Sequence, residues 1–275
     1  SFPTRRSSDL NSQVFDHTSV WRFLETRFGI SAPNISAWRR AVTGECTSGC
    51  DFSQNGSIEH YRDGMHGMKR ADKQCKLPPP NYQDEDLPAQ EKGNRPARAL
   101  PYELNVDGQV LADGFQLTFQ NTGSAGAAFR AAASDAKTGP WVFTVEAGKT
   151  LSYTLPRNGH YDFSVLGPNG FFRRFKGDGN DMVEIVLRHD TPGEVRCELR
   201  NGGAFAASLI LFSSYDVSAA RTSTLESGKS DAQVFSITQN ANWYDLRFET
   251  AGGFVRHFAG HIETGAASMS DPHLA

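Results

Sequence analysis

The strongest constraint on the fold is an internal repeat in the second half of the chain. Four sequence landmarks recur in the same order at an offset of 80 residues, which becomes 83 after one three-residue slip. The paired segments are 121–123 with 201–203, 145–149 with 225–229, 161–162 with 244–245, and 170–177 with 253–260. Self-similarity at a fixed period indicates a duplicated structural unit.

The repeated region has the pattern of β-structure. Short runs that alternate apolar and polar residues follow one another, with turn residues between them. The runs are 115–120, 141–145, 151–155, 161–166 and 171–175. Such alternation favours strands with one buried face, and a unit of this size suits a small β-sandwich. We therefore predict a mainly β fold with two tandem sandwich domains, at residues 102–188 and 189–265.

The region before the repeats, residues 11–76, starts with a helical pattern. Apolar side chains occur at the spacing of one helix face, at Val20, Phe23, Leu24 and Phe28. Thr18 or Ser19 is expected to cap the start of this helix, and Gly29 to end it in the left-handed conformation. A second short helix is predicted over residues 36–42, capped by Asn34 or Ser36. Residues 44–67 show no period and are expected to form a loop.

The remaining segments are predicted to be connections and tails. Residues 77–101 combine prolines, acidic residues and few apolar side chains, which favours an extended linker. Residues 1–10 share no pattern with the rest, and we take them as a disordered tail or a cloning artefact. They contain no signal peptide. We expect the fold to begin upstream of residue 11, and residues 266–275 to be an exposed tail.

Charge and hydropathy exclude some classes of function. The chain has 28 Lys and Arg residues against 31 Asp and Glu residues, and its net charge is −3. This balance excludes a basic surface for nucleic acid over the whole molecule. No apolar run approaches 18 residues, so we predict no transmembrane segment.

One candidate site lies at the start of the first helix, in Asp16-His17-Thr18-Ser19. Free N–H groups and the helix dipole favour a phosphate or another anion at such a position. Asp16 and His17 are the candidate catalytic residues, because they could transfer protons there, and Thr18 and Ser19 are the candidate substrate-binding residues. The alternative is that Asp16 and Thr18 only cap the helix, while His17 packs or faces solvent.

The four cysteines leave several arrangements open. Cys46, Cys50, Cys75 and Cys197 allow three disulfide connectivities. Zinc would need His60 or His66 beside the first three cysteines, and the spacing is not that of a usual zinc finger. A local disulfide or free thiols are favoured, and we expect no metal site in this chain.

A further candidate is the mixture of aromatic and cationic residues at 171–176. In one interpretation, Arg173 and Arg174 contact anionic lipid headgroups at a membrane. In the other, which the duplication favours, the aromatic side chains of a strand face the core and the arginines face water. The common nucleotide-binding, serine hydrolase and zinc protease motifs do not occur, so the chain shows no self-sufficient active site.

Several of these segments together resemble a known enzyme family. They are residues 14–20, 22–25, 33–36, 38–42, 90–91, 93, 95–104, 167–171 and 259–265. Residues 14–42 resemble the end of the catalytic domain of bacterial phosphocholine-specific phospholipases C, which belong to the alkaline-phosphatase-like phosphoesterases. The later segments look like the duplicated C-terminal domain of this family. The similarity runs from about residue 12 to 272.

The resemblance implies a secreted or periplasmic enzyme that hydrolyses phosphatidylcholine or sphingomyelin to release phosphocholine. Residues 11–76 would then be the remnant of an α/β phosphoesterase domain. The hydroxyl nucleophile of the family, and most of the carboxylates that bind its divalent metal, lie upstream of this segment, so we expect this chain alone to be inactive. Asp16 and His17 would border the catalytic pocket.

The expected partners are the chain's own upstream catalytic domain and a phospholipid substrate or membrane surface. The alternative function is a non-catalytic tandem β-module that binds membrane lipid or a partner protein.

Overall fold

The computed structural model describes residues 10–50, 93–135, 138–216 and 220–274. Two α-helices precede the strands: α1 spans His17–Phe28 and α2 spans Ala37–Val42. A short 3-10 helix, η1, covers Thr47–Gly49 within the predicted loop. None of the helices in these ranges is long and apolar enough to span a membrane.

The predicted helices form, but α1 begins earlier than expected. Its cap is Asp16, whose side chain accepts from the Thr18 backbone N–H, and the Ser19 hydroxyl accepts from the Asp16 backbone N–H. This reciprocal capping box puts the cap two residues before Thr18, the earlier of the two predicted caps. Gly29 ends the helix with a φ of 66°, as predicted. Ser36 caps α2, which was one of the two expected choices.

The first β unit consists of seven antiparallel strands within the described residues. They are β2 (Leu104–Val110), β3 (Phe115–Asn121), β4 (Ala127–Ala133), β5 (Trp141–Val145), β6 (Lys149–Leu155), β7 (Tyr161–Leu166) and β8 (Phe172–Gly177). Strands β2, β3 and β6 form one sheet, and β5, β4, β7 and β8 lie in the other. Alternate residues point between the sheets, as Phe115, Leu117 and Phe119 of β3 do.

The second unit repeats this arrangement strand for strand. Its strands are β9 (Val183–Arg188), β10 (Glu194–Asn201), β11 (Ala207–Ser213), β12 (Arg221–Leu225), β13 (Ser230–Ser236), β14 (Trp243–Glu249) and β15 (Val255–His261). Strands β9, β10 and β13 form a sheet that corresponds to β2, β3 and β6. The 3-10 helix η3 (Thr238–Asn240) precedes β14. The predicted duplication is therefore confirmed.

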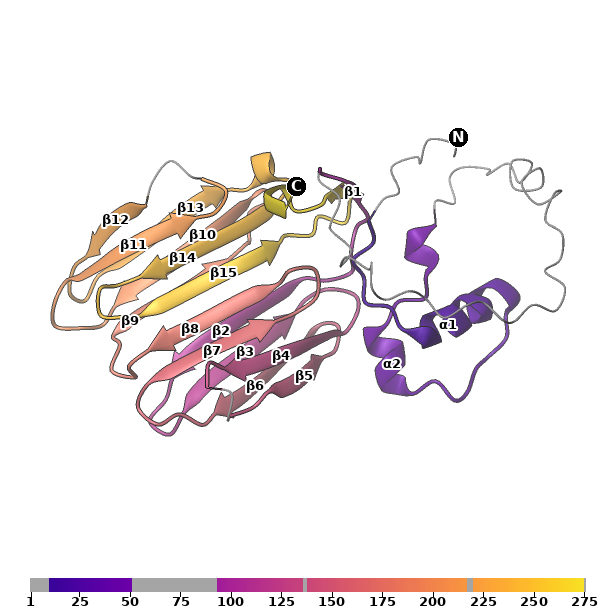
Figure 1. Ribbon diagram of the computed structural model, residues 1–275, viewed down its shortest axis with the longest axis horizontal. Helices are drawn as coiled ribbons and strands as arrows, with labels where there is room; N and C mark the ends of the chain where they lie inside the picture. Colours follow the sequence, from indigo (N-terminus) through magenta and orange to yellow (C-terminus); the bar gives the residue numbers. More distant parts are fainter. Residues whose placement is uncertain (1–9, 51–92, 136–137, 217–219, 275) are drawn as a thin grey trace, which may run out of the picture. The chain divides into compact units, whose positions relative to one another are not determined.

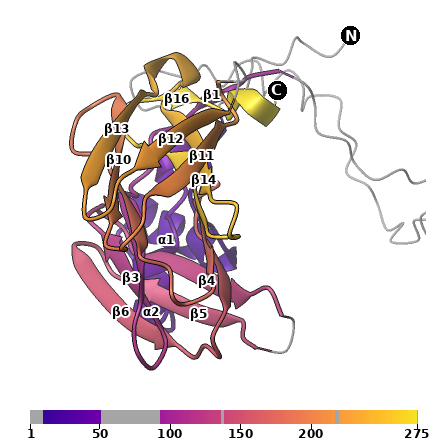
Figure 2. The same ribbon diagram turned by 90° about the vertical axis from the view of Figure 1, so that its left-hand side faces the viewer.

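The two units share one continuous sheet. Strand β15 pairs antiparallel with β8, so the larger sheets of both units join edge to edge in the order β12-β11-β14-β15-β8-β7-β4-β5. Figure 1 shows β8 and β15 side by side at this junction. The two three-stranded sheets lie on the other side of the cores and do not pair with each other (Figure 2). Each unit keeps its own apolar core.

The residues that mark the repeat in the sequence make equivalent contacts in the two units. Buried Asn121 donates to the carbonyls of Ala125 and Val145, at 2.9 and 3.0 Å. Its counterpart Asn201 donates to those of Phe205 and Leu225, at 2.8 and 2.9 Å. The same asparagine thus holds the same corner in both units. The repeated glycines at 148 and 228 adopt φ values of 68° and 67° in equivalent turns.

Two predicted boundaries need correction. The division after residue 188 placed β9 in the first unit, but β9 pairs with β10 and its side chains join the second core. The end of the predicted linker also packs. Within it, β1 (Pro96–Ala97) pairs with β16 (Ser268–Met269), and Leu100 is buried in the first core. Residues 77–92 of the linker lie outside the described residues.

The predicted C-terminal tail is likewise partly structured. It contains β16 and the 3-10 helix η4 (Pro272–Leu274). The Tyr215 hydroxyl donates to Asp271 at 2.8 Å, which ties the tail to the second unit.

Candidate functional site at the start of the first helix

The Asp16 carboxylate is fully engaged. Its Oδ1 accepts from the backbone N–H and the hydroxyl of Thr18, at 2.7 and 2.5 Å. Its Oδ2 forms an ion pair with Arg39 of α2. The Thr18 hydroxyl, assisted by Arg39, lowers the pKa of Asp16 against a smaller opposing effect of burial. Asp16 is thus an ionised helix cap that anchors α2 to α1.

The four residues of the candidate site do not point to one place. Thr18 and Ser19 are buried, and the Ser19 hydroxyl is used in the capping box. His17 is exposed at the first position of the helix. The geometry therefore matches the capping alternative for Asp16, and His17 is the member of the group that faces outward. That Asp16 and His17 border a catalytic pocket stays a prediction.

Other charged side chains of this segment are also paired internally. Glu25 of α1 accepts two hydrogen bonds from Arg40 of α2, both at 2.9 Å, and one from the Ala32 backbone N–H at 2.5 Å. The bonds from Arg40 lower the pKa of Glu25 to about 2. Arg22 donates to the Thr43 carbonyl. These contacts hold α1, α2 and the connection between them as one small folded element.

This element, residues 10–49, is bonded to the first β unit. The Val14 backbone N–H donates to the Tyr102 hydroxyl at 3.0 Å, and the Gly126 backbone N–H donates to the Ala41 carbonyl at 2.9 Å. The Trp38 indole N–H donates to the Thr144 hydroxyl of β5 at 2.9 Å. The segment that carries the candidate site is therefore positioned by the sandwich behind it.

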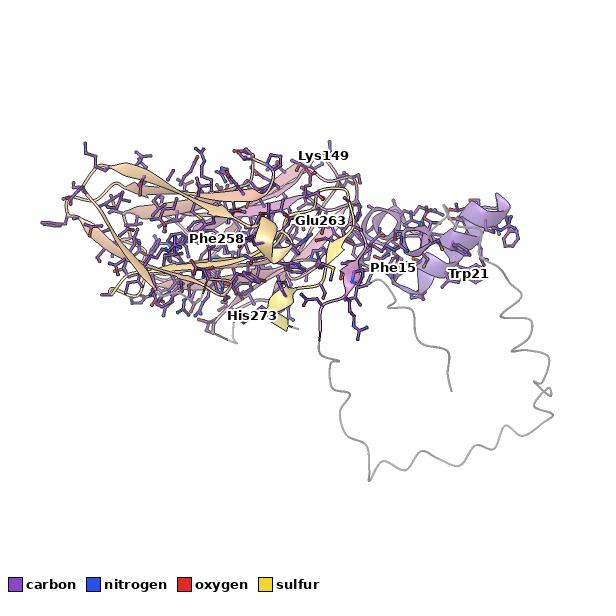
Figure 3. The ribbon with its side chains drawn as sticks, turned by 90° about the horizontal axis from the view of Figure 1, so that it is seen from above. Phe15, Trp21, Lys149, Phe258, Glu263 and His273 are labelled. Atoms are coloured by element: carbon purple, nitrogen blue, oxygen red, sulfur yellow. The ribbon has the colours of Figure 1, made fainter. Side chains whose placement is uncertain are left out.

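The apolar stripe of α1 is only partly covered within the described residues. Val20 and Phe28 of this stripe are exposed, and so is the neighbouring Trp21, whereas Phe23 and Leu24 are half-buried. Figure 3 labels Phe15 and Trp21 on this segment and Phe258 inside the second sandwich. The helix forms as predicted, and the described chain covers only part of its apolar stripe.

A cavity of about 310 Å³ lies beside Tyr102. Its lining includes Tyr102, Phe171, His189, His261 and Glu263 and none of residues 16–19. Burial lowers the pKa of His189, and the nearby charge of Arg173 acts in the same direction. Among the described residues, no three His, Cys, Asp or Glu side chains are grouped so that they could hold a metal ion.

Arg173 is not a surface residue. It is 0% exposed and points between the sheets, so the prediction that it contacts a membrane, or faces water, was wrong. The guanidinium crosses the β8–β15 junction and donates to the Tyr244 hydroxyl of the second unit at 2.9 Å. It also donates to the carbonyls of Phe172 and Ala259.

Arg256 of the second unit makes the reciprocal contact. It is 3% exposed and donates to the Tyr161 hydroxyl of the first unit at 2.9 Å. Each guanidinium also lies over aromatic rings of both units, with its nearest ring centroid at 4.2 Å, on Phe171 or Phe254. Tyr161 and Tyr244 were landmarks of the repeat, so the duplication has preserved a pair of crossed contacts.

Arg174 points to the opposite face of the sheet. Its side chain is 41% exposed and binds Asp162 through two hydrogen bonds, at 2.9 and 2.8 Å. His257 occupies the equivalent position in the second unit and contacts Asp245 at 2.6 Å. The contact of Arg174 with a membrane stays a prediction.

The cysteines supply no described catalytic or metal site. Cys197 is buried in the second core, where burial raises the pKa of its thiol to about 12. Such a thiol is not reactive at neutral pH. Cys75, His60 and His66, on which the zinc alternative depended, lie outside the described residues.

Comparison with known proteins identifies the doubled sandwich. The family model described as bacterial phospholipase C, C-terminal domain, matches twice, at residues 96–178 and 182–261. The chain belongs to the bacterial phospholipase C family. The two matches coincide with the two β units and place β9 in the second, in agreement with its pairing.

Relatives with curated names extend the similarity across nearly the whole chain. A non-hemolytic phospholipase C from Burkholderia pseudomallei is 40% identical over 96% of this chain and 41% of its own length. A non-hemolytic phospholipase C from Pseudomonas aeruginosa is 39% identical over 99% of this chain and 42% of its own. A hemolytic phospholipase C from the same organism is 33% identical over 99% and 43%. This chain thus spans less than half the length of these relatives.

Proposed function

We propose that this chain is the C-terminal part of an exported phospholipase C that hydrolyses phosphatidylcholine or sphingomyelin and releases phosphocholine. The observation that carries the proposal is the similarity to phospholipases C over at least 96% of the chain but less than half of their length. The catalytic residues would then lie mainly in the part of the protein that precedes this chain. That upstream part and the lipid substrate are the proposed partners.

The geometry of residues 16–19 favours a structural contribution of this chain to the enzyme and not a complete catalytic centre. Asp16 is held as an ionised cap and Thr18 and Ser19 are buried, so the group cannot act as nucleophile and base together. In the intact protein, a hydroxyl nucleophile upstream would attack the phosphorus atom. Hydrogen-bond donors and a divalent metal would stabilise the charge that develops there. We propose that His17, which is exposed, is the residue of this group that borders that pocket.

The test is phosphocholine release by two purified proteins. One is the product of the gene with its upstream coding sequence restored, and the other is the present chain. We expect release from phosphatidylcholine or sphingomyelin by the first and none above background by the second. Phosphocholine release by the present chain that is lost on mutation would contradict the proposal that the catalytic residues lie mainly upstream. An inactive full product that is folded and metal-loaded would contradict the assigned function.

A second candidate function is lipid binding by the tandem β-module, which Arg174 favours because it is partly exposed on the outer face of the shared sheet. Asp162 neutralises much of its charge, so the expected effect is small. Co-sedimentation of the chain with anionic vesicles should weaken in Arg174→Ala. An unchanged bound fraction would remove Arg174 from any lipid surface.

A further inference from the structure

The segment formed by residues 10–49 carries large apolar side chains that the described residues leave uncovered. We call this set the apolar face; its members are Val20, Trp21, Phe28 and Ile30. Each is between 57% and 63% exposed. Val14 and Phe15 lie on the same segment and are also exposed. Large exposed apolar side chains that include a tryptophan are typical of a protein interface.

The apolar face belongs to a segment whose helices are capped and held together by contacts within the segment. α1 has a capping box at its start and a left-handed glycine at its end, and α2 has a serine cap. The Arg39–Asp16 and Arg40–Glu25 ion pairs lock the two helices together. The segment therefore presents a preformed surface, which lowers the entropic cost of binding.

The opposite side of this segment is tied to the first β unit. Tyr102, Gly126 and Thr144 supply the hydrogen bonds described above. The Gly126 contact is close, because a Cβ added there would lie 2.9 Å from the Ala41 oxygen. The segment thus has one bonded side and one uncovered apolar side.

We propose that the apolar face docks onto the upstream part of the same protein and joins that part to the tandem β-units. This inference rests on the proposed function. The relatives contain more than half of their length outside the region they share with this chain, which supplies an occupant of sufficient size. Trp21 and Phe28 are the central contacts of the interface.

The charges of the segment favour a protein occupant over a lipid surface. Three of the four arginines of α1 and α2, Arg22, Arg39 and Arg40, donate to groups of their own segment, so their charges are largely committed to internal contacts. The fourth, Arg27, is exposed and lies over the Phe28 ring. A membrane-binding helix instead directs its cations toward the headgroups. Polar groups satisfied inside the segment, with apolar side chains outside, are what a dry and permanent interface requires.

Hydroxyl-radical labelling read out by mass spectrometry tests the docking. The present chain and the full gene product are labelled side by side. We expect several-fold lower labelling of Trp21 and Phe28 in the full product than in the present chain. Phe205 and Tyr153, which are exposed on the second and first sandwich, are the internal controls and should be labelled equally in both proteins.

A pair of variants of the full product adds a readout that does not depend on catalysis. Phe28→Ser should weaken the interface and expose Trp21 to labelling, whereas the matched change Phe205→Ser should not. If the Phe28→Ser product does not fold, labelling of Trp21 in the unmodified product still decides the matter.

The outcomes separate the docking from the proposed activity. Unprotected Trp21 in an active full product overturns the docking and leaves the function intact. Protected Trp21 in an inactive product overturns the function and leaves the docking. Protection in the present chain alone, with a dimer in sedimentation velocity, would assign the face to a second copy. Protection only on addition of phosphatidylcholine vesicles would assign it to lipid. The absence of an upstream coding frame would overturn the proposal.

Discussion

At the scale of single residues, the crossed arginines are the most informative feature. A buried guanidinium is costly unless its donors are satisfied and its charge is stabilised. Here the stabilising groups of Arg173 and Arg256 are tyrosine hydroxyls, the Asn105 side-chain oxygen, backbone carbonyls and aromatic rings. One nitrogen, the Arg173 Nε, has no hydrogen-bond partner. Each buried guanidinium therefore depends on few polar contacts, and loss of one should be measurable.

Tyr244→Phe should destabilise the chain by about 1–3 kcal/mol, because it leaves a buried donor of Arg173 without its acceptor. Chemical denaturation followed by circular dichroism measures the change. Tyr153→Phe is the matched control, since Tyr153 is partly exposed on β6, and its effect should stay within about 0.5 kcal/mol. Equal effects of the two substitutions would contradict a structural role of the crossed contact.

The sequence contained the signal for these arginines. Phe171, Arg173 and Phe175 alternate along one strand, so period-two geometry puts the arginine on the same side as both aromatic residues. The expectation that these arginines face water followed from their charge alone and did not take the alternation into account. What the sequence could not reveal is the acceptor, because Tyr244 lies 71 residues away in another unit.

Glu25 makes the helical segment sensitive to acid. Its pKa falls from an ordinary value of 4.5 to about 2 in the folded chain, chiefly through Arg40. A lowered folded pKa adds stability above pH 4.5, and this stability is lost as the pH falls toward 2. Limited proteolysis of residues 10–49 should thus show a large difference between the native chain and Glu25→Gln at pH 6 and little at pH 2. A constant difference across this range would contradict the assignment.

At the scale of elements, the local signals predicted α1 and α2 well and their packing poorly. The caps at Gly29 and Ser36 were readable because capping is decided by neighbouring residues. The direction of the apolar stripe was also readable. The extent of its burial was not, because burial depends on what lies opposite, and the described chain leaves Val20 and Phe28 of the stripe exposed. The role of residues 16–19 was left open for the same reason.

The contact between α2 and the first sandwich can be tested through a glycine. Gly126→Val should push the Ala41 carbonyl away and release the helical segment, because even a Cβ at this position would be too close. Ala206→Val, at the equivalent exposed turn of the second unit, is the control. We expect faster proteolytic removal of residues 10–49 in the first variant only. Equal cleavage of both variants would show that this contact does not hold the segment.

At the scale of the whole molecule, the duplication was predictable but the shared sheet was not. The repeat and the strand pattern are local properties of the sequence. The pairing of β8 with β15 joins the edge strands of two units, and no motif in either strand indicates that the two will pair. The boundary error at β9 has a similar origin, since only the pairing of β9 with β10 reveals its unit.

The shared sheet implies that the two units unfold together. A protein of residues 93–180 would lose the partner of the β8 edge and the acceptor of Arg173. We expect one calorimetric transition for residues 93–275 and no cooperative transition for residues 93–180. Two separate transitions in the longer protein, or a stable first unit alone, would show that the junction is dispensable.

The short pairing of β1 with β16 affects how the doubled sandwich can be inserted into other proteins. Because Pro96 lies opposite Met269, the chain enters and leaves the doubled sandwich at neighbouring points. A unit with adjacent entry and exit can be spliced into a host loop, or joined to itself and reopened elsewhere, without stretching what surrounds it. The doubled sandwich is therefore suited to transfer between proteins as one intact unit.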